Sequence, residues 1–504
     1  MRSNFIALLC LSIGCIGSFL TESIAQSVTS PYQTALGGGL AITSGLEAHF
    51  YNPANLVLRR DRRSFQVSVA MGGFQQTSGL NTSGYHDLFG SFAPYFAPKN
   101  PASRKTLSSE EFDRMFSDNN RYFETRSYDF VPIAASWTNG STARAVALRS
   151  RGLSSYEMNR NWFDSQSAQP DEDNPFSRTL NQNYHVFHEV SLGFAREVTM
   201  LNRWQAGLNT LLIGFSPKIV LGGMIKRVKY RSEYLSVPGG WQNTEHMEIL
   251  ATGDMSRFLT ELISSENADH AFRNHVNRNS NFEINGIGAG LDAGLTYIIP
   301  IGDDISLSPH IREPLKKSIR ISISLTDLGA VRYYNNPGDW QSRTIMRPFS
   351  DIPQSDLAYT GRPGEIFQYL KEDADESNVM ANLSLENDAP LLIQLPTELN
   401  MGSALQYRWI TTAIDLNYRF NTADFADDGW RASFGTQINI FRFLTLLGSL
   451  QLHDRENVFW GAGAVIDAGF ASISAGMKLS RNDPESETDW EINSLSVASL
   501  KIKL

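Results

Sequence analysis

The stretch NGIGAGLDAGLTYII, residues 285–299, alternates between two kinds of side chain. One set of alternate positions is apolar: Ile287, Ala289, Leu291, Ala293, Leu295, Tyr297 and Ile299. The other set is small or polar: Gly286, Gly288, Gly290, Asp292, Gly294 and Thr296. Successive side chains of a β-strand point to opposite faces, whereas a helix would mix the two sets. The stretch therefore predicts a long strand with one apolar face.

The same alternation recurs at 318–325, 410–420, 430–441, 470–480 and 494–504. A soluble β-sandwich alternates as well, so strand length and polar content have to decide. Strands of about ten or more residues match a tilted bilayer crossing. Their polar faces, which are rich in Gly, Ser, Asn, Arg and Asp, suit a wet lumen. No segment after residue 25 approaches 18 consecutive apolar residues, so we expect no membrane-spanning helices. Together with the long alternating strands, this predicts a transmembrane β-barrel.

The expected connections between strands alternate in length, as they do in outer-membrane barrels. Tight turns are expected at Ser216 and Pro217, at Arg408 and Trp409, at Phe441 and Arg442, and at 467–469. Long loops are expected at about 232–281, 335–394, 421–429 and 481–489, with a short amphipathic helix at 253–267. Counting back from Leu504 predicts about fourteen antiparallel strands that begin near residue 127, with further candidates at 64–73, 89–97 and 304–312.

The first 25 residues have the composition of a secretory signal peptide. Arg2 precedes an apolar run at 5–20, and a small-x-small exit ends at Ala25. The alternative is a lipoprotein signal with Cys15 as the lipidated residue, although Ser12 occupies the position where such signals usually have Leu. We therefore expect a signal peptide at 1–25, an N-terminal hatch at 26–63 and a barrel at 64–504.

Both cysteines, Cys10 and Cys15, lie in this leader, so the processed chain is expected to hold no disulfide and no Cys-based metal site. The formal net charge of −9 gives no support for nucleic-acid binding. The sequence suggests no metal and no cofactor.

The box YNPANL at 51–56 has the composition of a helix start ahead of the strands. Asn52 is a favoured N-cap, and Pro53 suits the first helical position because its missing N–H would have no partner there. The preceding glycine-rich stretch, LGGGLAITSGL, can turn tightly and pack its backbone closely. Such an ordered element before the barrel is expected to form a plug or lid.

The start ALGGGLAITSGLEAHFYNPANL resembles the long-chain fatty-acid transporter (FadL) superfamily of outer-membrane barrels. The matching positions, which the resemblance places in a hatch or gate, are Gly37, Gly38, Gly39, Tyr51, Asn52, Pro53, Ala54 and Leu56. Asn55 departs from the pattern, where the family usually has Gly. The resemblance implies fourteen strands, a plugged lumen and passage of hydrophobic molecules.

A second stretch, ISISLTDLGAVRYYNN at 321–336, is similar to the strand–Asx-Leu-Gly signature of the PorV-like branch of Bacteroidota, a Gram-negative group. The matching residues are Asp327, Leu328 and Gly329. The resemblance to that branch implies that the protein acts as a partner of a secretion system.

Three sequence patterns that could suggest catalytic or ligand-binding sites are better explained as ordinary parts of strands and loops. The run Gly286-x-Gly288-x-Gly290 lies inside an alternating strand and not at a strand-to-helix turn. His185 and His188 fall on opposite faces of a strand, and the acidic loops lack EF-hand spacing. His453 and Asp454 have no matching catalytic partner, so no enzyme is expected.

The leading functional hypothesis is passive outer-membrane transport of a hydrophobic or amphipathic small molecule, gated by the hatch around residues 52–56. Asp292, Arg320, Asp415 and Arg419 are the candidates for lining the lumen. The alternative is a PorV-like barrel that does not transport and instead docks secretion or envelope proteins through its long loops. Outer-membrane lipid is the expected surrounding in either case.

Overall fold

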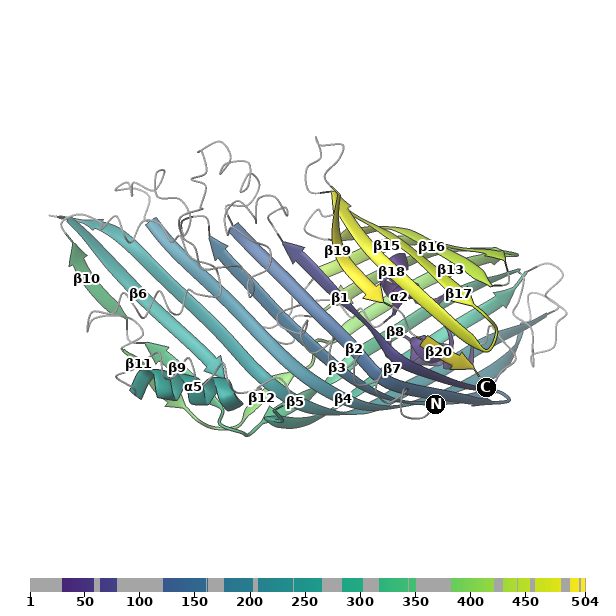
Figure 1. Cartoon of the computed structure of the whole chain (residues 1–504), viewed down its shortest axis with the longest axis horizontal. Helices are drawn as coiled ribbons and strands as arrows, with labels where there is room; N and C mark the ends of the chain where they lie inside the picture. Colours follow the sequence, from purple (N-terminus) through teal and green to yellow (C-terminus); the bar gives the residue numbers. More distant parts are fainter. Residues whose placement is uncertain are drawn as a thin grey trace, which may run out of the picture.

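The computed structural model describes residues 30–58, 64–78, 121–159, 161, 176–202, 207–238, 240–264, 283–301, 317–342, 344–349, 382–420, 429–441, 443–453, 458–481, 490–497 and 500–503. The predicted signal peptide at 1–25 and the strand candidates at 89–97 and 304–312 lie outside these residues. The described strands form a closed antiparallel barrel (Figure 1).

Fourteen wall positions make up the ring in the described part of the chain. In ring order they are β1 (Phe65–Ser78), β2 (Arg121–Asn139), β3 (Thr142–Asn159), β4 (Phe176–Asn202), β5 (Gly207–Val237), β7 (Gly286–Pro300), β8 (Lys317–Tyr333), β13 (Glu398–Tyr407), β14 (Ile410–Arg419), β15 (Gly429–Phe441), β16 (Leu444–His453), β17 (Val458–Asp467), β18 (Ala471–Arg481) and, as one broken strand, β19 (Trp490–Val497) with β20 (Leu500–Lys503). The ring closes because β1 pairs with β2 on one edge and with β19 and β20 on the other. The predicted barrel of about fourteen strands is confirmed.

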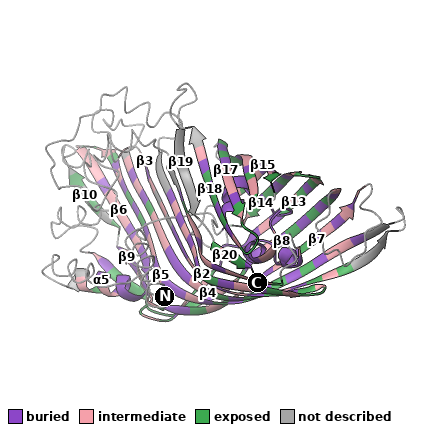
Figure 2. Cartoon of the chain, turned by 45° about the vertical axis from the view of Figure 1, so that its right-hand side comes forward, coloured by how far each residue is buried: buried purple, intermediate pink, exposed green. Residues whose placement is uncertain are grey.

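The alternation at 285–299 becomes the two faces of β7. Ile287 is 53% exposed and Leu295 is 42% exposed, whereas Asp292 and Thr296 are buried. Figure 2 shows buried and exposed positions alternating along the strands around the wall. The predicted apolar face therefore points outward, and the small and polar face points into the lumen.

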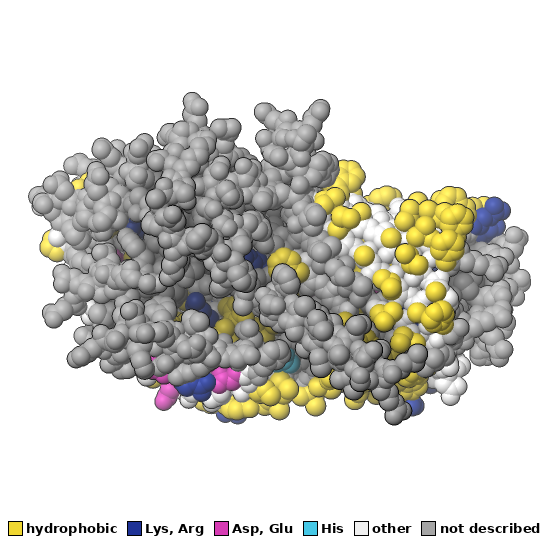
Figure 3. All heavy atoms as spheres, in the orientation of Figure 1, with side chains coloured by type: hydrophobic (Ala, Val, Ile, Leu, Met, Phe, Trp, Pro, Cys, Tyr) yellow, Lys and Arg dark blue, Asp and Glu magenta, His cyan; other side chains and the backbone are white. Residues whose placement is uncertain are grey.

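The outward faces carry large apolar side chains on most of the wall strands. Examples are Ile133, Leu148, Leu192, Phe215, Ile219, Leu291, Ile321, Ile323, Leu405, Ile414, Phe434, Leu446, Trp460 and Ile473. Figure 3 shows such side chains spread over the right-hand part of the molecule, where β15 to β18 lie in Figure 1. An apolar outer band around a polar interior is the arrangement that a bilayer requires. Among the helices in the described ranges, none is long and apolar enough to cross a membrane.

Short turns join the strands at one rim of the barrel. Residues 140–141 join β2 to β3, residues 408–409 join β13 to β14, and residues 468–470 join β17 to β18. Gly140, Arg408 and Gly469 take positive φ angles of 57°, 56° and 85°, which tight turns require. The predicted turns at 408–409 and 467–469 therefore lie between strands as expected, whereas Arg442 of the turn predicted at Phe441 and Arg442 lies outside the described residues.

The predicted turn at Ser216 and Pro217 is wrong, because β5 runs straight through both residues. Pro217 pairs with Leu291 on β7, and the register of β5 with β7 is continuous on either side. Proline lacks an N–H and so weakens one edge of the ladder, but it does not force a turn. The sequence reading therefore split one 31-residue strand in two and demoted β1 to an additional candidate.

The stretches expected to be long loops at 232–281 and 335–394 contain regular structure. They hold β6 (Gly240–Ala251), α5 (Gly253–Ser264), β9 (Gly338–Ser342), β10 (Ile345–Phe349), β11 (Leu383–Asn387) and β12 (Leu391–Gln394). The far end of β5 pairs with β6, and β6 pairs with β9 and β10. These elements form an extension of the wall, seen at the left of Figure 1. The helix predicted at 253–267 is α5, with Phe258 and Leu259 buried.

The N-terminal segment, residues 30–58, lies inside the ring. It contains the short helix α2 (Pro31–Leu36) and two 3₁₀ helices, η1 (Gly45–Phe50) and η2 (Pro53–Val57). The first helix contacts β15 to β19, while η2 contacts β3, β4, β5 and β7. Asn52 caps η2 and Pro53 is its first residue, so the predicted cap is present on a helix of five residues.

Candidate functional site

Asn52 joins the N-terminal segment to the wall. Its Oδ1 accepts a hydrogen bond from the amide of Ala54 at 3.2 Å, which caps η2. Its Nδ2 donates to Thr296 Oγ1 on β7 at 2.9 Å, and this hydroxyl contacts Ser322 Oγ on β8 at 2.8 Å. One side chain therefore starts the helix and ties it to two strands.

Tyr51 is fixed at both ends. Ser324 on β8 donates to its carbonyl oxygen at 2.7 Å, and Asn417 on β14 donates to its hydroxyl oxygen at 2.7 Å. Burial raises the pKa of Tyr51 well above its usual value, so the phenol stays neutral. These two bonds connect the box to β8 and β14.

The glycine stretch binds a carboxylate of the wall. Asp415 on β14 accepts hydrogen bonds from the amides of Gly39 at 2.7 Å and Leu40 at 3.0 Å. Gly37 and Gly39 have φ angles of +71° and +70°, a region in which residues with a Cβ are strained. A Cβ on Gly38 would lie 2.9 Å from the Asp415 Cβ. The three glycines therefore let the backbone approach this carboxylate.

Glycines of the wall provide the space for the segment. A Cβ on Gly214 would lie 2.3 Å from the Ala54 nitrogen, and one on Gly294 would lie 2.0 Å from Asn52 Oδ1. On the other side of the lumen, a Cβ on Gly461 would lie 2.3 Å from the carbonyl oxygen of Ala35. The segment thus packs directly against bare backbone on both sides, which leaves it no room to shift outward.

Asn55, which stands where the resemblance would place Gly, binds two carbonyl oxygens of the glycine stretch. Its Nδ2 donates to the carbonyl oxygens of Leu40 at 2.8 Å and Thr43 at 3.1 Å, and the residue is fully buried. A glycine at this position would leave both carbonyls without that donor. Asn55 therefore holds the box against the glycine stretch.

His49 makes a further contact with the wall, through Nε2 to Ser191 Oγ at 2.7 Å. Burial lowers the pKa of His49 to about 3, because a charged imidazole would be desolvated. The ring is therefore neutral and acts as a hydrogen-bonding partner.

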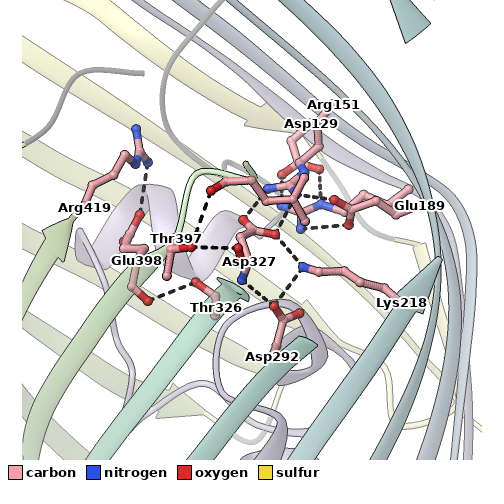
Figure 4. Close-up of polar contacts among 12 residues, drawn as sticks. Asp129, Arg151, Glu189, Lys218, Asp292, Thr326, Asp327, Thr397, Glu398 and Arg419 are labelled. Carbon is pink, nitrogen blue, oxygen red and sulfur yellow. Dashed lines mark hydrogen bonds and ion pairs between the residues drawn. The ribbon is translucent and has the colours of Figure 1, made fainter. Parts of the chain in front are cut away.

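A buried ionic network lies beside the segment, centred on Asp327 (Figure 4). Its carboxylate receives both Nη atoms of Arg151, at 2.7 Å each, and Lys218 Nζ. Lys218 also binds Asp292 Oδ1 at 2.8 Å. Arg151 extends the network to Glu189 on β4, and Arg149 binds Asp129 on β2. Such pairs fix geometry, because removal of one partner leaves the other charge buried and uncompensated.

The backbone at Asp327 is shaped for this role. Its φ is +58°, and two residues of β8 face Asp292 alone on β7, which is the pattern of a β-bulge. The amide of Asp327 donates to Asp292 Oδ1 at 2.7 Å, and its carbonyl accepts from Thr397 Oγ1 at 3.0 Å. The bulge turns the Asp327 carboxylate toward Arg151 and Lys218.

A second ionic group lies on the next strands of the ring, where Glu398 on β13 is in register with Thr326 on β8. Glu398 on β13 binds Arg419 Nη2 at 3.0 Å and also binds Arg431 on β15. Arg320 on β8 contacts Gln406 and reaches the carbonyl oxygen of Ala41 at 3.4 Å. Both arginines that the sequence placed in the lumen therefore have polar partners there.

The described part of the lumen contains a cavity of about 40 Å³ between the N-terminal segment and the two ionic groups. Its lining residues include Gln33, Gly38, Phe50, Tyr51, Asp129, Arg149, Arg151, Asp327, Glu398, Arg419 and Arg431. This volume accommodates roughly three water molecules and no lipid chain. Within the described residues, no three His, Cys, Asp or Glu side chains are grouped to hold a metal ion.

A family model described as "Family of unknown function (DUF5723)" matches residues 53–477, from the box to β18. The chain belongs to the DUF5723 family. No curated protein matches its sequence.

Solved structures similar to this DUF5723 chain include a TodX deltaS2S3 mutant monoaromatic hydrocarbon channel, with 11% identity, 95% of this chain and 99% of the other covered, and a TM-score of 0.46. They also include the Pseudomonas putida toluene transporter TodX (9% identity, 95% and 98% covered, TM-score 0.38). A third is a Pseudomonas aeruginosa FadL homologue (8% identity, 95% and 98% covered, TM-score 0.26).

The structure brings most of the sequence-predicted site residues together around one segment. Asp415 and Arg320 contact the glycine stretch, Asp292 belongs to the Asp327 network, and Arg419 pairs with Glu398. Sequence reasoning missed several polar residues of this DUF5723 chain: the buried His49, Asp129, Arg149, Arg151, Glu189, Lys218 and Glu398, and the half-buried Arg431. A signal was available for two of them, since Arg149 and Arg151 are two positions apart in ALRSRGL at 147–153 and so fall on one face of a strand. The roles of all these residues in gating or permeation stay predictions.

Proposed function

We propose that this protein is a passive outer-membrane channel for hydrophobic or amphipathic small molecules, closed at rest by the N-terminal segment. The observation that carries the proposal is a barrel with an apolar outer band and a lumen filled by a segment of its own chain. Noncovalent contacts hold that segment in the lumen, among them the ion pair of Lys501 with Glu47 at 2.8 Å. A filling that is reversible in this way is what a gated channel requires. Binding and diffusion need no cofactor.

The charged lining favours amphipathic molecules over pure hydrocarbons. Beside the segment the cavity borders Arg151, Asp327, Glu398 and Arg431. A molecule with a polar head can exchange hydrogen bonds with these groups as it passes, whereas a hydrocarbon would desolvate them without compensation. Substrates of this class are expected to enter from the side of the wall extension and to leave past the N-terminal segment.

A vesicle experiment tests the proposal. Purified protein is reconstituted into liposomes that enclose a fluorescent fatty-acid-binding reporter, and entry of dodecanoate and of dodecane is followed. Dodecanoate should enter at least about tenfold faster than into protein-free liposomes, the excess expected when a bilayer barrier is replaced by a lined path. Equal rates with and without protein, together with no apolar ligand extracted from the purified barrel, would refute the transport function.

The second candidate is a PorV-like barrel that docks secretion or envelope proteins. The observation in its favour is the wall extension, where Met346 on β10, Leu385 on β11 and Leu392 on β12 are 64%, 51% and 71% exposed. Exposed apolar side chains beyond a lipid band mark contact sites for other proteins. Affinity purification in mild detergent should then recover large envelope proteins in stoichiometric amounts, and the substitution Leu385→Lys should reduce that recovery. A barrel that purifies alone would exclude the docking function.

A further inference from the structure

We propose that one edge of β11 (Leu383–Asn387) takes up an extended, basic segment of another envelope protein, which pairs with it as an additional strand. The site lies on the wall extension and not in the lumen, so the inference goes beyond transport. It rests on the second candidate function, because it gives that docking a defined contact and a partner of defined chemistry.

β11 is held along one edge, where it pairs with β9 (Figure 1). Ser384 lies opposite Gln341, and Leu385 lies opposite Trp340. Within the described ranges, no strand pairs with the other edge of β11, which is called here the open edge. A strand directs its backbone N–H and C=O groups alternately to its two sides, so about half of those of β11 point away from β9. These groups can form a ladder with an incoming strand.

Both faces of β11 are accessible as well. The seven residues from Ser384 to Pro390 are all exposed, although successive side chains of a strand point to opposite faces. Leu385 is 51% exposed on the face that it shares with the buried Trp340. A second strand can therefore lie beside β11 with side chains on both faces of the sheet.

The open edge lies beyond the apolar band of the barrel. On β8 the outward residues Ile321 and Leu328 are apolar, and the exposed Arg332 follows near the end of the strand. On the extension, the outward row next to β11 is polar, because Glu248 pairs with Gln341 and its side chain is 42% exposed. A polar outer face belongs in water and not in hydrocarbon. The open edge is therefore within reach of a segment of another protein.

The surroundings of the open edge are acidic. The stretch LSLENDAP, which begins with β11, contains Glu386 and Asp388 and no Lys or Arg. β9 adds Asp339, whose pKa is raised by partial burial and by the nearby carboxylates of Glu248 and Glu386. Arg227 acts in the opposite direction without reversing the shift. Such an accumulation of negative charge attracts basic side chains and repels acidic ones.

The charges decide which kind of strand fits. Charged side chains and bulges on an edge commonly prevent pairing with other chains, and β11 has both, since its register shifts between Leu385 and Asn387. Antiparallel pairing of two copies would bring Glu386 and Asp388 close to the same residues of the other copy, and like charges across a strand pair are destabilising. A basic strand pairs opposite charges instead. The partner segment should therefore be basic and carry an apolar residue beside Leu385.

Peptide binding to the full-length protein in phosphatidylcholine nanodiscs tests the inference, with fluorescence anisotropy as the measurement. The probe is a labelled strand of alternating Lys and Val. One control is a strand of alternating Glu and Val, and the other is the Lys and Val strand with N-methyl groups on two adjacent central amides. The methylated strand keeps its charge but cannot pair along either edge. The probe should bind at least about tenfold more tightly than each control. Equal binding of the methylated strand would mean attraction by charge alone and overturns the proposal.

A variant and hydrogen–deuterium exchange locate the binding. Glu386→Lys should weaken binding of the probe at least about tenfold, because it places like charges side by side. The matched control is Glu233→Lys on β5, which makes the same change on the extension away from the open edge and should leave binding nearly unchanged. In wild type, the probe should protect amides at 383–388 from exchange. Full affinity in Glu386→Lys, or protection confined to other residues, overturns the proposal.

The remaining outcomes separate this inference from the functions above. Dimers of the barrel that Glu386→Lys stabilises or dissociates would identify a second copy as the occupant and overturn the basic partner. Recovery of envelope proteins by a barrel that does not bind the probe would place docking on another surface and overturn the role of β11. If the barrel purifies alone, the docking function fails, and probe binding still decides whether the open edge accepts a basic strand.

Discussion

Asp327→Asn is expected to lower the free energy of unfolding by about 3 kcal/mol, among the largest effects of any single substitution in this barrel. The change keeps the shape of the side chain and removes one negative charge from the network. Arg151 and Lys218 then remain buried, with side-chain exposures of 7% and 1%, and share too few carboxylates. An uncompensated buried charge is far more costly than the loss of an exposed pair. Urea unfolding of vesicle-refolded protein measures the difference.

Two further variants separate charge from backbone conformation at Asp327. Asparagine tolerates the left-handed region and alanine does not, so Asp327→Ala should cost about 1 kcal/mol more than Asp327→Asn. Asp327→Gly avoids the backbone strain of a positive φ, so its free energy of unfolding should be close to that of Asp327→Asn. The matched control is Arg231→Ala, which removes a pair with Glu233 in which the arginine side chain is 64% exposed. That exposed pair should contribute less than about 1 kcal/mol. An asparagine variant as stable as wild type would show that Asp327 does not organise the network.

The barrel could be predicted because the period of two in the sequence is local. Each strand displays its own faces, so Ile287 and Asp292 reveal outside and inside without knowledge of any neighbour. Strand boundaries are harder to predict, because a proline can lie either in a turn or within a strand. Pro217 suggested a turn, but it lies in β5, where its missing N–H removes one ladder bond and the remaining pairs with β7 hold the strand. Tertiary pairing overrode the local signal.

The candidate site could be predicted only where one residue acts on its own neighbourhood. The bond from the Ala54 amide to Asn52 joins residues two positions apart, so this cap could be predicted from the local sequence. The close backbone packing of the glycine stretch could be predicted in the same way. The contact between Arg151 and Asp327 joins residues 176 positions apart, and its existence depends on the register of β3 and on the bulge in β8. Nothing in a single sequence sets that register. The inward positions of Arg149 and Arg151 were accessible, but their partners were not.

Gly214→Ala is expected to displace the N-terminal segment and open the barrel. The new Cβ would lie 2.3 Å from the nitrogen of Ala54 and 2.4 Å from the carbonyl carbon of Pro53. Both are backbone atoms, so no side-chain rotation relieves the clash. Overpacking of this kind costs about 2 kcal/mol. If that cost falls on the closed state alone, the ratio of open to closed barrels rises roughly thirtyfold.

Conductance across planar lipid bilayers measures this ratio directly. Wild-type barrels should be silent for most of the recording, and Gly214→Ala barrels should show frequent long openings. Gly448→Ala is the matched control, because a Cβ there would meet only the Gly461 carbonyl oxygen, at an ordinary 3.8 Å. It makes the same change in composition inside a wall strand and should stay silent. A Gly214→Ala barrel that is fully stable yet still silent would mean that the wall moves to accommodate the methyl group. The YNPANL box would then move together with the wall, and closure of the barrel would not depend on close packing of the box against Gly214.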